Sequence, residues 1–200
     1  MSRMENTEQI TVTSVADVPW PDVRTVFGTR GYPSRCWCQY FKPPTSGWKQ
    51  GTPEECSALL RQQVVANAHA PGLIAYVGDE PAGWCAIEPR PNYSRLRRTK
   101  VVTQGSREDP DDASVWAVTC FVVRIGFRRR RVANALLAGA VDHARLHGAR
   151  IVEAYPVDVS ARPDAAAADL YHGALSQFVK ASFDVVSHPT DHRAVVQLTL

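Results

Sequence analysis

The stretch FVVRIGFRRRRVANALLAGAVDHA, Phe121–Ala144, places four consecutive arginines between an apolar run and an alanine- and leucine-rich segment. The apolar run reaches back to Val115 and is almost continuously apolar and β-branched, as in a strand buried on both faces. From Val132 onward, apolar residues recur at steps of three and four, and Gly148 stands where a helix would end. The stretch therefore predicts a strand, a basic turn and a helix.

The residues after this helix complete a β-α-β unit. ARIVEAYPVD, residues 149–158, is a second β-rich run. Two strands joined through one helix are expected to lie parallel in the same sheet. The start of the helix collects backbone N–H groups without partners and the positive end of the helix dipole, and the arginines add charge-assisted hydrogen bonds. The turn is thus a predicted site for a phosphate or pyrophosphate.

The N-terminal third of the chain alternates between regular segments and a loop. Residues 10–15 have strand composition, and residues 17–28 favour a helix that starts late because of its two prolines. Residues 29–51, rich in glycine, proline and aromatic residues, are predicted to form a long structured loop. Thr52, with Pro53 and Glu55 after it, has the spacing of a capping box at the start of a helix.

Further along, residues 72–90 predict an antiparallel hairpin, because two β-rich runs flank the turn sequence GDEP. Residues 95–112 have a basic half and an acidic half, and they favour either a solvated connection or a loop that folds over a substrate. Residues 163–182 predict a helix and residues 183–200 a terminal hairpin.

Composition limits the class of protein. With 200 residues and 44% hydrophobic content, the chain can bury a sizeable core, and we expect one compact domain over residues 1–200. The net charge of +3 is too small to indicate a nucleic-acid protein by itself, although it suits an anionic ligand. The polar first residues and the lack of a long apolar run predict a cytoplasmic protein without a membrane segment.

The cysteines do not predict a metal or disulfide framework. They are five in number, which suits a reducing compartment, and only Cys36 and Cys38 stand close together. A zinc site would need further ligands, and no second Cys/His cluster at a familiar spacing supplies them. The cysteines are therefore interpreted as small apolar packing residues, and no metal is expected.

The segment VVRIGFRRRRVANALL resembles the central motif of the GCN5-related N-acetyltransferases (GNAT), which reads Gln or Arg, two residues, Gly, one residue, Gly or Ala. Arg128 matches the first position and Ala133 the last. FVKASFDVV, residues 178–186, resembles a second family segment, and the likeness covers nearly the whole chain. It implies an α/β fold with a central mixed β-sheet flanked by helices. It also implies transfer of an acetyl group from acetyl-CoA to a primary amine.

The resemblance also implies where acetyl-CoA, the cosubstrate, would bind. In the family, the backbone of the strand pairs with the pantetheine arm, the N–H groups of the turn hold the pyrophosphate, and a splay between the two central strands admits the thioester. The residues expected to bind acetyl-CoA are Phe121, Val122, Val123, Arg128, Arg129, Arg130, Arg131, Val132, Ala133 and Phe178.

Two positions depart from the family pattern. Arg131 stands where the motif has its glycine, which lets the backbone approach the pyrophosphate closely. Helical dihedral angles at a helix start do not require glycine, so we expect binding to be retained. Phe178 stands where many members carry the tyrosine that protonates the leaving thiolate, and phenylalanine cannot donate a proton.

Other residues must therefore supply the acid and the base. Tyr171, seven residues before Phe178 and so on about the same helix face, is the candidate acid; the alternative is that it only packs. Glu153 is the candidate base, and the alternative is that it pairs with an arginine. The candidate acceptor-binding residues are aromatic, and they could instead only anchor a long loop: Tyr32, Trp37, Tyr40 and Trp84.

Two other functions remain open at this point. The chain could be a degenerate member of the fold that binds acyl-CoA as a regulator without turnover, given Arg131 and Phe178. It could also use the arginines of residues 128–131 on nucleic-acid phosphates, which is disfavoured because no aromatic residues are interleaved with them. The acceptor is a small-molecule or peptide amine, and a homodimer could form through an exposed edge of the terminal hairpin.

Overall fold

The computed structural model describes residues 9–43, 51–162, 164 and 169–200. The strands form one seven-stranded mixed sheet in the order β1-β2-β3-β4-β5-β7-β6, in which only the β4–β5 pair is parallel. The strands are β1 (Ile10–Ser14), β2 (Gly72–Val77), β3 (Glu80–Pro89), β4 (Val115–Val123), β5 (Ile151–Ala154), β6 (Asp184–Thr190) and β7 (Arg193–Thr199).

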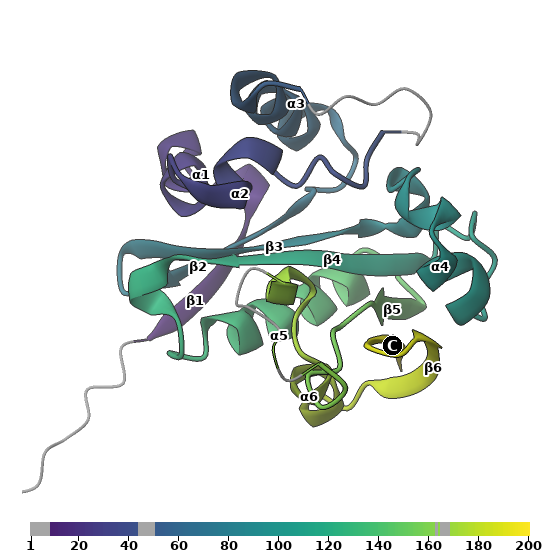
Figure 1. Ribbon diagram of the computed structural model, residues 1–200. Helices are drawn as coiled ribbons and strands as arrows, with labels where there is room; N and C mark the ends of the chain where they lie inside the picture. The colour runs from purple at the N-terminus through teal and green to yellow at the C-terminus, as the bar shows by residue number, and fades with distance from the viewer. Residues whose placement is uncertain (1–8, 44–50, 163, 165–168) are drawn as a thin grey trace, which may run out of the picture.

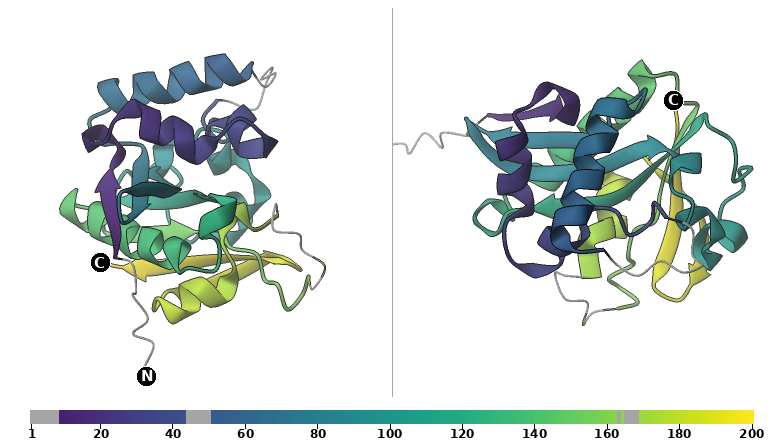
Figure 2. Two further views of the ribbon diagram at one scale, coloured as in Figure 1. Left: turned by 90° about the vertical axis from the view of Figure 1, so that its left-hand side faces the viewer. Right: turned by 90° about the horizontal axis from the view of Figure 1, so that it is seen from above.

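Helices cover both faces of this sheet, as Figures 1 and 2 show. One face carries α1 (Trp20–Phe27), α2 (Gly31–Cys36) and α3 (Pro53–Ala66). The other carries α5 (Val132–Leu146) and α6 (Leu175–Lys180), and α4 (Lys100–Gly105) packs on β6 and β7. No helix in the described part of the chain combines the length and apolar character needed to cross a bilayer. The predicted mixed sheet flanked by helices is confirmed.

The β-α-β unit forms the centre of the sheet, where two strands diverge. β4 and β5 run parallel and pair from Val115 with Ile151 to Val118 with Ala154, which confirms the predicted orientation. Among the described residues, β4 makes no further pairs with β5, so its last five residues, 119–123, keep a free edge on that side. The sheet therefore splays open at its centre, between the ends of β4 and β5.

The predicted capping box and the two predicted hairpins are present. Thr52 and Glu55 form the capping box of α3, with Thr52 Oγ1 accepting from the backbone N–H of Glu55 and Glu55 Oε2 accepting from that of Thr52. β2 and β3 form the predicted hairpin, and β6 and β7 form the terminal one. β6 is an edge strand, because it pairs only with β7 in the described sheet.

Three segments differ from the sequence prediction. The presumed loop of residues 29–51 contains the short helix α2, which opens at Gly31. Residues 95–112 are partly helical, as η3 (Leu96–Arg98) and α4. The predicted helix of residues 163–182 is shorter, consisting of η5 (Asp169–His172) and then α6; residues 163 and 165–168 lie outside the described residues. Local propensity missed these short elements because tertiary packing stabilises them.

Two apolar clusters fill the layers on either side of the sheet. The larger lies between the sheet and α5, and includes Leu136 and Trp116. Gly83 of β3 allows α5 to approach closely, since a Cβ there would lie 2.8 Å from Val132 Cγ1. The second cluster lies beneath α1–α3 and includes Trp37 and Trp84.

Lowering the pH is expected to destabilise the protein in part through His143, which packs beside His147 and Trp116. Burial, with smaller effects from His147 and His69, lowers the pKa of His143 to about 4, against 6.5 for an ordinary histidine. The unfolded chain takes up this proton first, so the free energy of unfolding falls as the pH drops from 6.5 towards about 4. Urea titrations across this range should show a shallower pH dependence for His143→Gln; equal slopes would contradict the prediction.

Candidate active site

The turn between β4 and α5 has an unusual backbone. After η4 (Ile125–Phe127), Arg129 and Arg131 both adopt left-handed conformations, with φ of 61° and 63°. Arg131 is the N-cap of α5, with ψ of 10°. This corrects the expectation of helical dihedral angles at the position where the family motif has glycine. Arginine here holds the conformation that glycine adopts at no steric cost.

The backbone of this turn leaves donors unpaired. Within the described residues, the N–H groups of Arg129, Arg131, Val132 and Ala133 donate to no backbone acceptor. The carbonyl of Arg131 accepts from Asn134 and Ala135, at 3.0 Å each, so the helix begins directly after it. Left-handed residues in such a turn make the N–H groups converge into an anion-binding concavity. The turn therefore fits a pyrophosphate group, and the exposed arginines of residues 128–131 surround it with positive charge.

Replacing Arg131 by glycine is expected to raise the free energy of unfolding by up to about 1 kcal/mol. The left-handed conformation costs an L-residue roughly 1–2 kcal/mol, and the greater freedom of glycine in the unfolded chain offsets part of the gain. Arg130→Gly is the matched control, because Arg130 is not among the residues with positive φ and should lose stability. Urea unfolding measures both variants. A lower stability for Arg131→Gly would show that its side chain makes contacts worth more than the strain.

The residues of β4 and α6 that were predicted to bind acetyl-CoA differ in how far their side chains are buried. Phe121 and Val122 are almost buried, Val123 is half-buried, and the Val123 carbonyl accepts from Arg128 Nε at 3.4 Å. Phe178 is fully buried between Phe121 and Phe183, with ring centroids 6.2 and 5.3 Å away. This position favours a packing role for Phe178 over the predicted contact with acetyl-CoA.

Glu153 lies in a buried network rather than in a cavity. Its Oε1 accepts from Arg90 Nη1 at 2.8 Å and from the Tyr155 hydroxyl at 2.6 Å. Its Oε2 accepts from the Ser106 hydroxyl at 2.6 Å and from Gln197 Nε2 at 2.8 Å. Arg90 and Glu153 are both fully buried. In correction of the predicted role as base, the geometry favours the alternative, in which Glu153 pairs with an arginine.

A small cavity of about 230 Å³ lies where β5 ends and the sheet splays open. We call it the splay pocket. Its walls come from the segment before α3, the η3–α4 region, the end of β5, η5 and the start of β7. The lining residues are Tyr40, Phe41, Leu96, Thr99, Val101, Tyr155, Tyr171, His172, His192 and Arg193.

Tyr171 lines the splay pocket, as does its neighbour His172. Their rings lie 4.1 Å apart, and η5 packs against β4. Burial raises the pKa of Tyr171, although the nearby charge of Arg193 acts in the opposite direction. Burial lowers the pKa of His172, the charge of Arg193 adds to that effect, and a hydrogen bond with the backbone of Thr119 opposes it. At neutral pH the pocket therefore presents a protonated phenol and a neutral imidazole.

The four aromatic residues predicted to bind the acceptor are divided between core and surface. Trp37 is buried and stacks on Phe27 at 4.6 Å, and Trp84 is fully buried with Nε1 donating to Cys38 Sγ at 3.2 Å. For these two, the position favours the alternative, in which they anchor the loop. Tyr32 is half exposed on α2, and Tyr40 lines the splay pocket.

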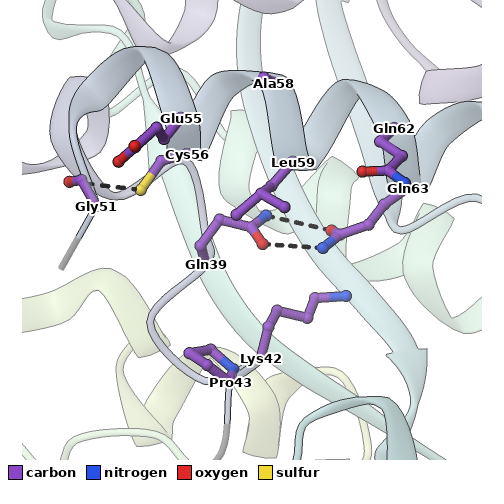
Figure 3. A pocket seen from close by; sticks show the side chains of 10 residues that line it. All are labelled: Gln39, Lys42, Pro43, Gly51, Glu55, Cys56, Ala58, Leu59, Gln62 and Gln63. Carbon is purple, nitrogen blue, oxygen red and sulfur yellow. Dashed lines mark hydrogen bonds between the residues drawn. The ribbon is translucent and has the colours of Figure 1, made fainter. Parts of the chain in front are cut away.

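A larger cavity of about 640 Å³ lies on the other side of the segment that carries Tyr40, between this segment and α3. Figure 3 shows the side chains of Gln39 and Gln63 facing each other across it, joined by hydrogen bonds of 3.2 and 2.9 Å. Lys42 also lines it, and its ammonium forms an ion pair with the buried carboxylate of Glu88. Burial lowers the pKa of Lys42 to about 7.

The cysteines do not gather metal ligands. The interaction of the Cys38 thiol with the Cys120 thiol, together with burial, raises the pKa of Cys38. Among the described residues, no group of three or more histidine, cysteine, aspartate or glutamate side chains could hold a metal ion.

Comparison with known proteins identifies the family. The family model described as "Acetyltransferase (GNAT) family" matches residues 34–174, which run from the end of α2 through the splay and η5. The chain belongs to the GNAT acetyltransferase family. Members of this family are N-acetyltransferases, and their fold binds acetyl-CoA. No curated protein matches the sequence.

Solved structures with low sequence identity share the GNAT fold. A GCN5-related N-acetyltransferase from Kribbella flavida is 16% identical, with a TM-score of 0.55, over 96% of this chain and 98% of that one. The yncA putative acetyltransferase from Salmonella typhimurium, solved with acetyl-CoA, is 11% identical, with a TM-score of 0.54 and coverages of 96% and 94%. A ribosomal-protein-alanine N-acetyltransferase from Brucella melitensis is 10% identical, with a TM-score of 0.55 and coverages of 95% and 99%.

His172 and Arg193 are among the residues of the splay pocket that sequence reasoning missed. His172 is adjacent to the candidate acid Tyr171, but the predicted helix gave no reason to bring it to β4. Arg193 opens the last strand, far along the chain from Tyr40 and Tyr155. No local signal marks Arg193, because its place in the pocket depends on the order of strands in the sheet.

Proposed function

We propose that the protein is an acetyl-CoA-dependent N-acetyltransferase that transfers an acetyl group to a primary amine. The observation that carries the proposal is the turn of residues 128–131, whose left-handed arginines and unpaired N–H groups precede α5. This anion-binding turn stands beside the free edge of β4, at the splay of the sheet. Family membership supports the same reaction class.

In the proposed reaction, the chain contributes binding, orientation and a proton. The N–H groups at the start of α5 and the arginine side chains hold the pyrophosphate. The free edge of β4, residues 119–123, holds the pantetheine arm. The amine nitrogen attacks the thioester carbonyl carbon, the C–N bond forms and the C–S bond breaks. Tyr171 is the proposed acid that donates a proton to the leaving thiolate. The amine passes one proton to water, and water returns a proton to the tyrosine after it has acted as the acid.

Calorimetric titration with acetyl-CoA tests the proposal, with S-acetylpantetheine as the matched ligand that lacks the pyrophosphate. We expect saturable binding of acetyl-CoA at about one site per chain, at least about tenfold tighter than S-acetylpantetheine, since charge-assisted hydrogen bonds are strong. A titration with a short oligonucleotide serves as a control for non-specific binding to the arginines. No acetyl-CoA binding, with salt-dependent binding of the oligonucleotide, would overturn the proposal.

Thiol release in the presence of amines separates catalysis from binding alone. Free CoA formed from acetyl-CoA at a rate that depends on an added amine is the expected result. Binding of acetyl-CoA without transfer to any amine would instead indicate an acyl-CoA-binding regulator.

A further inference from the structure

The splay pocket has the location and size of an acceptor site for one small group. It is bounded by Tyr155, directly after β5, and by His172 of η5, which packs against β4. Its volume of about 230 Å³ is below the roughly 300–1,000 Å³ of pockets for drug-sized ligands. The part of an acceptor inside it is therefore about as large as one amino-acid residue.

The described residues that line this pocket include a permanent positive charge and no carboxylate. Among the described residues that line it, Arg193 is the only lysine or arginine, and none is an aspartate or a glutamate. Within the described part of the chain, the Arg193 side chain is half-buried and has no ion-pair or hydrogen-bond partner. Burial also lowers the pKa of Arg193. A guanidinium removed from water without a carboxylate beside it is costly, and an anionic ligand would offset that cost.

Most of the remaining lining residues are aromatic or apolar, and the other polar ones are Thr99, His172 and His192. Tyr40, Phe41 and Tyr171 contribute rings, and Leu96 an alkyl side chain. His172 is 2% exposed, and its Nδ1 has no hydrogen-bond partner among the described residues. Among the described residues, Arg193 thus has no acceptor in the pocket. The carboxylate of an amine that also carries one would supply this acceptor, and the aromatic walls would contact an apolar side chain.

We propose that the acceptor amine also carries a carboxylate, as in an amino acid with an apolar or aromatic side chain, and that Arg193 binds this carboxylate. This inference rests on the proposed acetyltransferase function and specifies its substrate class. The guanidinium fork matches a carboxylate in a bidentate geometry. The same charge disfavours polyamines, because no described lining residue offers a carboxylate to a second ammonium.

Matched pairs of amines test the role of the carboxylate in acetyl transfer. We use L-phenylalanine with 2-phenylethylamine, L-tryptophan with tryptamine, and L-leucine with 3-methylbutylamine. In the best pair, kcat/KM for the amino acid is expected to exceed that for the decarboxylated amine by about tenfold or more. Arg193→Gln should bring this ratio close to one, and Arg193→Lys should retain part of it. Arg145→Gln, an exposed α5 arginine paired with Asp142, is the control.

A binding measurement makes the test independent of turnover. The N-acetyl derivatives of the same three pairs are titrated calorimetrically into the protein, with and without CoA. At least one N-acetyl amino acid is expected to bind about tenfold tighter than its neutral partner, and Arg193→Gln is expected to remove the difference. Titration of each variant with acetyl-CoA reports separately on the proposed function.

Each outcome decides one of the two proposals. Failure of acetyl-CoA binding, with carboxylate-dependent ligand binding intact, overturns the acetyltransferase function but leaves the anion site. No carboxylate preference in binding or transfer overturns the substrate class, whatever the acetyl-CoA result. If Arg193→Gln weakens acetyl-CoA binding and leaves the carboxylate ratio unchanged, Arg193 contacts the cosubstrate, and the inference is wrong.

Discussion

Replacing Arg90 by methionine is expected to lower the free energy of unfolding by about 3–5 kcal/mol, the cost of breaking a buried ion pair from one side. Arg90 and Glu153 are both fully buried, and the variant leaves the carboxylate without its cation. The backbone carbonyl of Asp109 and the hydroxyl of Ser106 also lose a donor. Because natural domains have only about 5–15 kcal/mol of stability, this loss is a large share of the total.

Chemical unfolding in urea measures this loss, and a second variant identifies its cause. In Arg90→Met/Glu153→Leu the buried charge is gone, so part of the lost stability should return, since an apolar pair replaces a buried ion pair at little cost. Arg145→Gln is the surface control, because exposed ion pairs contribute only about 0–1 kcal/mol. If the double variant were no more stable than Arg90→Met, packing of the arginine stem would account for the effect instead.

The ion pair shows why the role of Glu153 could not be predicted from sequence. Glu153 lies on a strand that is apolar on both sides, and a lone acidic residue there suits either a catalytic base or a buried partner. The partner is 63 residues earlier in the chain, at the end of β3, and only the sheet order brings the two together. Gln197 joins them from β7 for the same reason.

The elements that sequence did predict are those with a local cause. The capping box of Thr52 and Glu55 satisfies backbone donors within one turn. The parallel pairing of β4 and β5 was predicted because an apolar run is followed by a helical segment and then by a second β-rich run. The basic turn was found in the same way, because a strand and a helix flank the arginines.

The backbone conformation and the burial of individual residues were harder to predict than the type of each secondary-structure element. The left-handed φ of Arg131 could not be predicted from the residue itself, since arginine usually avoids it, and only the glycine of the family motif at this position points to it. Trp37 comes from the aromatic segment and Trp84 from the hairpin, and either side chain could face in or out. The packing of α1–α3 on the sheet buries both. Short helices such as α2 depend on this packing too, because isolated turns of helix are unstable.

If Tyr171 is the acid of the proposed reaction, Tyr171→Phe will lower kcat by about a hundredfold, a typical contribution of general acid catalysis. The variant keeps the ring that packs beside His172 and removes only the hydroxyl. Its KM for acetyl-CoA should change little, because the turn of residues 128–131 supplies the anion contacts. Initial rates of CoA release at saturating amine measure the effect.

Tyr76→Phe is the matched control, because the Tyr76 hydroxyl donates to Asp22 at 2.6 Å and does not line the splay pocket. Its kcat should stay near that of the unchanged protein. Burial raises the pKa of Tyr171, so its phenol remains protonated at neutral pH and can supply a proton to the thiolate in every turnover. If Tyr171→Phe kept kcat within about twofold, the tyrosine would only pack against His172, and the thiolate would have to leave unprotonated or take its proton from water.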